Sequence, residues 1–234
     1  MLGRGIFMRR FLSFSFMFVF TALVLVPIFS AEHTVSAVSV RERALPVIVV
    51  DAGHGGMDGG AVGPDGLLEK DLNLSISLRL ADFLRAFGFP VVLTRDADEM
   101  QGGKAEDIRA RAALAESCGE DAIFVSIHQN KFPQTSSHGT QTFFGLRGSG
   151  SEALAELLQT EIVRKLQPEN HRMCQPGGSG IYLLKNLPCT AVMIECGFLS
   201  NDDDVRLLTD ETYQSRLAFV IAGTILEYVN QTEV

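Results

Sequence analysis

The chain has 234 residues, 46% of them hydrophobic, and a formal net charge of −8 at pH 7. This length suits one substantial domain and leaves too little for a second. The acidic balance argues against a nucleic-acid partner, because a general binder needs a basic face to displace counterions and no Lys/Arg run occurs outside the N-terminus.

The N-terminal 37 residues have the layout of an export signal. Three arginines within the first ten residues precede an apolar run, 11–29, that contains no charge. This order is typical of a secretory signal peptide, and Val35-Ser36-Ala37 supplies the small residues that cleavage needs. The run is also close to bilayer-spanning length, so an uncleaved anchor stays open. In both cases the positive-inside rule places the following residues outside the cytoplasm, with the membrane contacted only through residues 1–37.

After a polar linker at residues 38–45, the hydrophobic pattern alternates between strands and helices. Short apolar, β-branched runs predict strands at 46–50, 90–94, 122–127, 140–144, 181–184 and 191–194. Apolar residues at helical spacing predict helices at 68–87, 106–118, 154–166 and 202–228. Such alternation predicts an α/β fold over residues 46–230, a single α/β/α sandwich whose mainly parallel sheet has about six strands.

The four cysteines predict no disulfide framework. They show no C-x-x-C spacing, and the domain is large enough to fold without a bridge. We therefore expect buried thiols at Cys118, Cys174, Cys189 and Cys196.

Three side chains at the ends of these elements have the chemistry of a metal site. His54 follows the first strand in a glycine-rich loop, Glu69 opens the next helix, and His128 ends a central strand. The carboxyl ends of parallel strands meet at one edge of an α/β sheet, so these residues should converge. Two imidazoles and a carboxylate, with a fourth position left for water, are typical of hydrolytic zinc. Each residue alone also has a structural explanation; Glu69, for example, suits a helix N-terminus as a simple first-turn acid.

A fourth residue, Glu195, ends the last predicted strand after four apolar residues. A buried carboxylate must be paired, metal-bound or used in chemistry. We predict that Glu195 is a general base and acid beside the Zn²⁺ ion. The alternative is a structural ion pair with Arg95, Arg109 or Arg111. Asp51 and Asn130 are predicted to hold an imidazole in its metal-binding orientation.

These residues lie within five blocks that resemble one known family, the zinc-dependent N-acetylmuramoyl-L-alanine amidases of the third amidase type. The resemblance covers residues 46–229 and rests on VVDAGHGGMDGGA (49–61), GLLEKD (66–71), LTR (93–95), VSIHQN (125–130) and IECGFLSN (194–201). It implies an α/β/α sandwich, zinc held by His54, Glu69 and His128, and Glu195 as the catalytic acid/base. The implied substrate is peptidoglycan, cut at the amide between the lactyl group of N-acetylmuramic acid and the L-alanine of the stem peptide. An activator protein is a further partner that the resemblance allows.

Shorter strings narrow the resemblance to one branch. The segment between His128 and Thr140 leaves no room for the inhibitory helix of some divisome-regulated relatives. Residues 140–144, 167–170 and 195–197 resemble the sporulation amidases, which strip stem peptides from spore cortex so that muramic δ-lactam can form. Three alternatives stay open: a zinc peptidase acting on stem peptides, a non-catalytic wall-binding module, and a thiol enzyme using Cys196 and His128.

Overall fold

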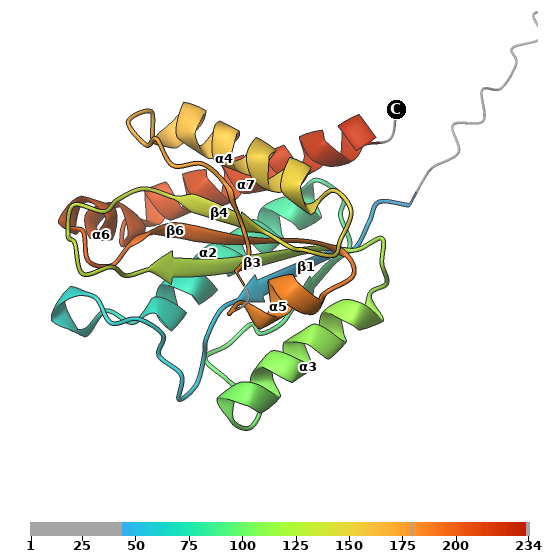
Figure 1. The fold of residues 1–234 in the computed structure, drawn as a ribbon, viewed down its shortest axis with the longest axis horizontal. Coiled ribbons are helices and arrows are strands. Elements are labelled where there is room, and N and C mark those ends of the chain that lie inside the picture. The colour runs from blue at the N-terminus through green and yellow to red at the C-terminus, as the bar shows by residue number, and fades with distance from the viewer. Residues whose placement is uncertain (1–43, 179, 233–234) are drawn as a thin grey trace, which may run out of the picture. The chain divides into compact units, whose positions relative to one another are not determined.

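The computed structural model describes residues 44–178 and 180–232, which form one sheet between two layers of helices (Figure 1). The predicted signal peptide or anchor at residues 1–37, and most of the predicted linker at 38–45, lie outside these residues and stay predictions. Among the described residues, no helix combines the length and the apolar character that a bilayer crossing requires.

The sheet has six strands in the order β2-β1-β3-β6-β4-β5. Strands β2, β1, β3 and β6 are mutually parallel, whereas β4 pairs antiparallel with β6 and parallel with β5. The sheet is therefore mainly parallel, as predicted. The strands are β1 Ile48–Ala52, β2 Val91–Leu93, β3 Ile123–Asn130, β4 Gln141–Phe144, β5 Gln175–Pro176 and β6 Thr190–Phe198.

Helices cover both faces of the sheet. Successive residues of the central strands point to opposite sides, so Val50 and Val125 pack with α2, α4 and α7, while Val49 and Phe124 pack with α3 and α5. Figure 1 shows α4 and α7 on one side of the sheet and α3 and α5 on the other. This confirms the α/β/α sandwich. The helices are η1 Pro64–Gly66, α2 Glu69–Ala86, α3 Lys104–Ser117, α4 Ser151–Leu166, α5 Tyr182–Asn186, α6 Asp202–Leu208 and α7 Glu211–Thr232.

Two predicted elements are wrong. Residues 182–184 form the first part of helix α5 and not a strand, because a four-residue apolar run can be buried by either element. Leu183 and Leu184 pack into the core on the α3 side. The sixth strand is instead the short, exposed β5, which carries no apolar signal. The predicted helix at 202–228 is divided into α6 and α7, since the Asp210 carboxylate accepts the N–H groups of Thr212 (2.6 Å) and Tyr213 (3.2 Å) and starts a new helix.

Candidate active site

The loop after β1 holds His54 in an unusual backbone conformation. His54 has a φ of 61°, in the left-handed region that non-glycine residues seldom adopt. Two arginine side chains fix this loop by donating to its carbonyl groups. Arg111 binds the oxygens of Ala52 (2.6 Å) and His54 (2.6 Å), and Arg95 binds those of Ala52 (2.9 Å) and Gly53 (3.1 Å). The hydrogen bonds from the two arginines thus stabilise a strained turn that presents the imidazole to the carboxyl edge of the sheet.

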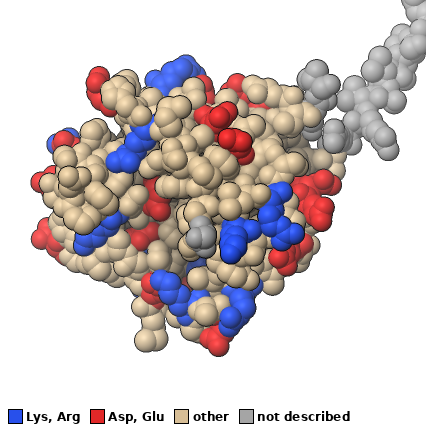
Figure 2. All heavy atoms as spheres, in the orientation of Figure 1, with Lys and Arg blue, Asp and Glu red and all other residues tan. Residues whose placement is uncertain are grey.

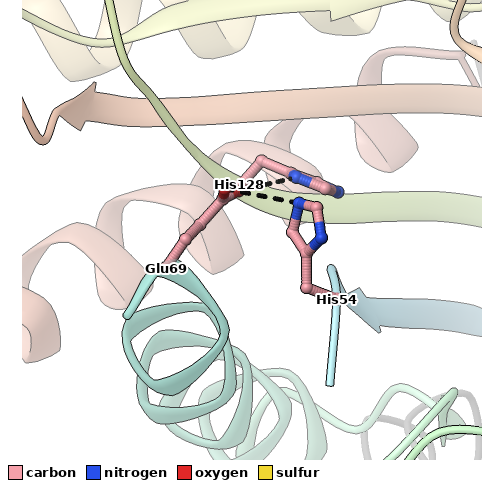
Figure 3. A group of neighbouring side chains, drawn as sticks. All are labelled: His54, Glu69 and His128. Carbon is pink, nitrogen blue, oxygen red and sulfur yellow. Dashed lines mark hydrogen bonds and ion pairs between the residues drawn. The ribbon is translucent and has the colours of Figure 1, made fainter. Parts of the chain in front are cut away.

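His54, Glu69 and His128 converge at that edge (Figure 3). Glu69 is the first residue of α2 and reaches between the two imidazoles: its Oε1 lies 2.9 Å from His128 Nδ1 and its Oε2 lies 3.3 Å from His54 Nε2. One ligand atom from each of the three residues lies within 4.8 Å of the others. The structure thus brings together all three residues that the sequence predicts as one site, although His128 lies within β3 and not beyond its end.

Two glycines leave space for these side chains. A Cβ atom on Gly53 would overlap the imidazole ring of His128. A Cβ atom on Gly60, which has a φ of +68°, would lie 2.8 Å from His54 Cδ2 and also crowd the Glu69 carboxylate. The glycine-rich loop therefore allows close approach between backbone and side chains at the site.

The electrostatics of the group favour an ionised Glu69 carboxylate between the two imidazoles. Burial alone would raise the pKa of Glu69, but hydrogen bonds from His128 and His54 hold it well below its usual range. Burial likewise opposes protonation of His54, yet Glu69 and then Asp58 raise its pKa above the ordinary value. The ionised Glu69 carboxylate therefore favours positive charge beside its two oxygens.

Glu195 lies beside this group but makes no ion pair. It sits within β6, opposite His128 in the β3–β6 register, and none of the ion pairs among the described residues involves it. Its Oε2 is fully buried and has no hydrogen-bond partner among those residues. Desolvation, partly offset by His128, raises the pKa of Glu195 to about 7. The alternative ion pair with a nearby arginine is therefore not formed; Arg95 and Arg111 bind the His54 loop instead.

The residue that orients His54 is Asp58, which the sequence reasoning missed. Asp58 Oδ2 lies 2.9 Å from His54 Nδ1 and 3.1 Å from Lys104 Nζ. The predicted role of Asp51 is wrong: its carboxylate accepts from Arg111 (2.8 Å), Ser126 (2.6 Å) and Thr94 (2.8 Å), and so ties β1 to its neighbours. No hydrogen bond joins the Asn130 side chain to an imidazole in the part of the chain described. The sequence signal for this orienting role is the position of Asp58, four residues after His54 in the glycine-rich loop.

Cys196 does not have the surroundings of a catalytic thiol. It is 1% exposed, and burial raises the pKa of its thiol far above the ordinary value. A reactive cysteine needs an accessible thiolate, so the interpretation as a thiol enzyme loses its support. All four cysteines are free, and Cys189 and Cys196 are buried as expected, but Cys118 and Cys174 are only partly buried, so the expectation of buried thiols is wrong for these two.

An open cleft of about 280 Å³ leads to these groups. His54, His128, Asp58 and Glu195 line its polar side. Its apolar lining comes from α3, the α5 region and β6, through Ile108, Ile181, Tyr182, Leu183 and Met193. On the face shown in Figure 2, acidic and basic side chains are interspersed. The cleft can thus accept a substrate that offers both polar and apolar groups.

The fold and the site together define a class: an α/β enzyme whose histidines and carboxylates gather at the carboxyl edge of a parallel sheet. Comparison with known proteins is consistent with this class. A family model described as N-acetylmuramoyl-L-alanine amidase matches residues 48–227. The germination-specific N-acetylmuramoyl-L-alanine amidase of Bacillus subtilis is 38% identical in an alignment of 194 positions that covers 79% of this chain and 80% of that protein.

Solved structures agree in fold. The CwlD amidase of Clostridioides difficile, determined in complex with the GerS lipoprotein, has a TM-score of 0.75 and 37% identity, covering 79% of this chain and 98% of that one. The amidase AmiC2 of Nostoc punctiforme has a TM-score of 0.70 and 32% identity, covering 80% and 98%. The chain therefore belongs to the N-acetylmuramoyl-L-alanine amidase family, as the motif blocks predict, and is a peptidoglycan amidase.

Proposed function

We propose that this chain cleaves the amide between the lactyl group of N-acetylmuramic acid and L-alanine with zinc-activated water. His54, Glu69 and His128 would hold the zinc ion, and Glu195 would act as general base and acid. The observation that carries the proposal is the juxtaposition of three ligand atoms within 4.8 Å of one another with a buried carboxylate oxygen that has no partner.

The donor set fits zinc. Two histidine nitrogens and one carboxylate oxygen are the ligands of many hydrolytic zinc centres. One ligand atom from each of His54, Glu69 and His128 lies within 4.8 Å of the other two, so the three residues could bind a single ion. A bound zinc ion would supply Lewis acidity, lowering the pKa of water toward neutrality.

The remaining chemistry belongs to the chain. The Glu195 carboxylate accepts a proton from the attacking water as the oxygen of that water bonds to the lactyl carbonyl carbon. It then returns this proton to the alanine nitrogen as the C–N bond breaks, leaving a lactyl carboxylic acid and a free amine. A carboxyl group with its pKa near 7 can accept and donate a proton at neutral pH. Asp58 meanwhile holds the His54 ring through Nδ1, leaving Nε2 toward Glu69.

Two variants separate metal binding from proton transfer. Glu195→Ala should fold and bind zinc but lose about 10²–10⁴-fold in turnover on purified peptidoglycan. His54→Ala should lose the zinc itself, measured by metal analysis after gel filtration. Wild-type turnover by Glu195→Ala, or full zinc retention by His54→Ala, would contradict the assigned roles.

We further propose an exported enzyme that acts in spore cortex maturation. Identity of 38% to a germination-specific amidase supports the cortex role, and the N-terminal arrangement of residues 1–37 supports export. Expression in a spore-forming strain that lacks its own cortex amidase should restore muramic δ-lactam, detected by mass spectrometry of cortex digests. Vegetative wall turnover without restored δ-lactam would assign the enzyme to the vegetative wall.

An activator protein is a further proposed partner. The CwlD amidase was solved with the GerS lipoprotein, and 37% identity supports a comparable complex here. Turnover of zinc-loaded protein should rise when lipoproteins encoded in the same genome are added singly. Full activity of the protein alone would remove this partner from the proposal.

A further inference from the structure

One buried amide connects the segments that carry all three candidate ligands. Asn73 lies on α2, one turn after Glu69, and is fully buried. Its Nδ2 donates to the carbonyl oxygen of Gly53 (3.0 Å), the residue before His54, and to Glu69 Oε1 (3.3 Å). Its Oδ1 accepts from Gln129 Nε2 (3.1 Å), and Gln129 directly follows His128. Asn73 thus bonds to one candidate ligand and to the chain neighbour of each of the others.

Gln129 completes this connection from β3. Its backbone N–H donates to Glu69 Oε1 (3.1 Å), and only 3% of the residue is exposed. The other carboxylate oxygen, Oε2, accepts the N–H of Ala61 at 2.8 Å. Fixed donors therefore hold both oxygens of Glu69 in an interior where a lost hydrogen bond leaves an unsatisfied polar group.

We propose that Asn73 is a positioning residue that sets the relative placement of the three zinc ligands, and that Gln129 acts through it. This inference rests on the zinc site proposed above. Without the Asn73 amide, the Gly53 carbonyl loses its donor from α2 and keeps the one from Arg95, while Glu69 loses a donor that fixes its rotamer. Loss of groups that orient metal ligands weakens metal affinity by about 10–100-fold.

A matched pair of variants on α2 tests the role. Asn73→Ala should weaken zinc binding by about 10–100-fold in competition titrations with a chelator of known affinity. Ser77→Ala is the control: Ser77 lies one turn further along α2, is also fully buried, and its hydroxyl has no partner among the described residues. This control should bind zinc within about twofold of the wild type.

Cobalt provides a readout that a general loss of stability would not change. The visible absorption bands of the Co²⁺-loaded protein depend on ligand geometry, so Asn73→Ala should shift them in position or intensity while Ser77→Ala leaves them unchanged. Wild-type zinc affinity together with an unchanged cobalt spectrum in Asn73→Ala would overturn the inference. Failure of the wild-type protein itself to bind zinc would instead refute the proposed function.

A second route remains if Asn73→Ala does not fold. Gln129→Met removes the donor to Asn73 with little change in volume, and should weaken zinc binding less than Asn73→Ala does. Asn73→Asp keeps the acceptor for Gln129 but removes both donor bonds and adds a charge beside Glu69, so it should weaken zinc binding strongly. In the Asn73→Asp background, Gln129→Met should cost further affinity, whereas in a folded Asn73→Ala background it should cost none. If Asn73→Ala does not fold, wild-type zinc affinity in both Asn73→Asp and Gln129→Met would overturn the inference. If Asn73→Ala folds, equal effects of Gln129→Met in wild-type and Asn73→Ala proteins would show that Gln129 does not act through Asn73.

Discussion

Replacing Glu195 with glutamine should make the metal-free protein more stable above neutral pH while reducing its activity. Burial raises the pKa of Glu195 from its ordinary value of 4.5 to about 7. Between these values the folded state binds a proton that the unfolded chain has lost, so the contribution of this group to stability is full below pH 4.5 and falls as pH rises through 7. At about 1.4 kcal/mol per pKa unit, the loss amounts to at most about 3 kcal/mol.

The assay is urea unfolding of metal-free wild type and Glu195→Gln, followed by circular dichroism from pH 4 to pH 8. Glutamine does not titrate, so the stability of the variant relative to the wild type should increase across this range by up to about 3 kcal/mol. Glu161→Gln is a control at a carboxyl group whose pKa is shifted in the opposite direction. Arg164 and Lys165 lower the pKa of Glu161 to about 2, so the effect of this substitution should be level above pH 5. A stability difference for Glu195→Gln that stays constant from pH 4 to pH 8 would refute the burial of an ionisable carboxylate.

Three further predictions concern the loop, the orientation of His54 and the last helix. Gly53→Ala should lower zinc affinity by at least tenfold in chelator competition, because its Cβ would displace the His128 ring; unchanged affinity would show that the ring can move freely. Asp58→Asn should weaken zinc binding by about tenfold, since a neutral partner at His54 Nδ1 leaves the imidazole less basic. Calorimetric titration measures this affinity, and an unchanged zinc affinity would contradict the role of Asp58. Asp210→Ala should cost about 1 kcal/mol in denaturant unfolding without changing zinc affinity, because it removes the α7 cap; no loss of stability would mean that α7 does not depend on this carboxylate.

The sequence predicts most of the fold because the parallel strands are buried on both faces. Such strands are apolar over most of their length, and the runs that open β1, β3 and β6 are clear for this reason. Short elements near the antiparallel edge are harder to predict. Leu183 and Leu184 bury their side chains equally well from a helix, and β5 is held by backbone pairing with β4 rather than by apolar side chains.

The residues of the candidate site also divide into those that the sequence predicts and those that it does not. His54, Glu69 and His128 could be placed together because each lies where the topology of a parallel sheet brings chain segments to one edge. The groups that orient them could not be assigned in the same way. Whether Asp51 or Asp58 reaches the His54 ring depends on the left-handed turn at His54, and this turn depends on arginines that are distant in sequence.

Mass spectrometry of peptidoglycan digested by the zinc-loaded protein identifies the bond that is cut. We expect stem peptides with a free L-alanine amino terminus and glycan strands that carry intact lactyl groups, with both products lost when zinc is chelated. Peptides cut within the stem, with the lactyl–alanine amide intact, would contradict this expectation.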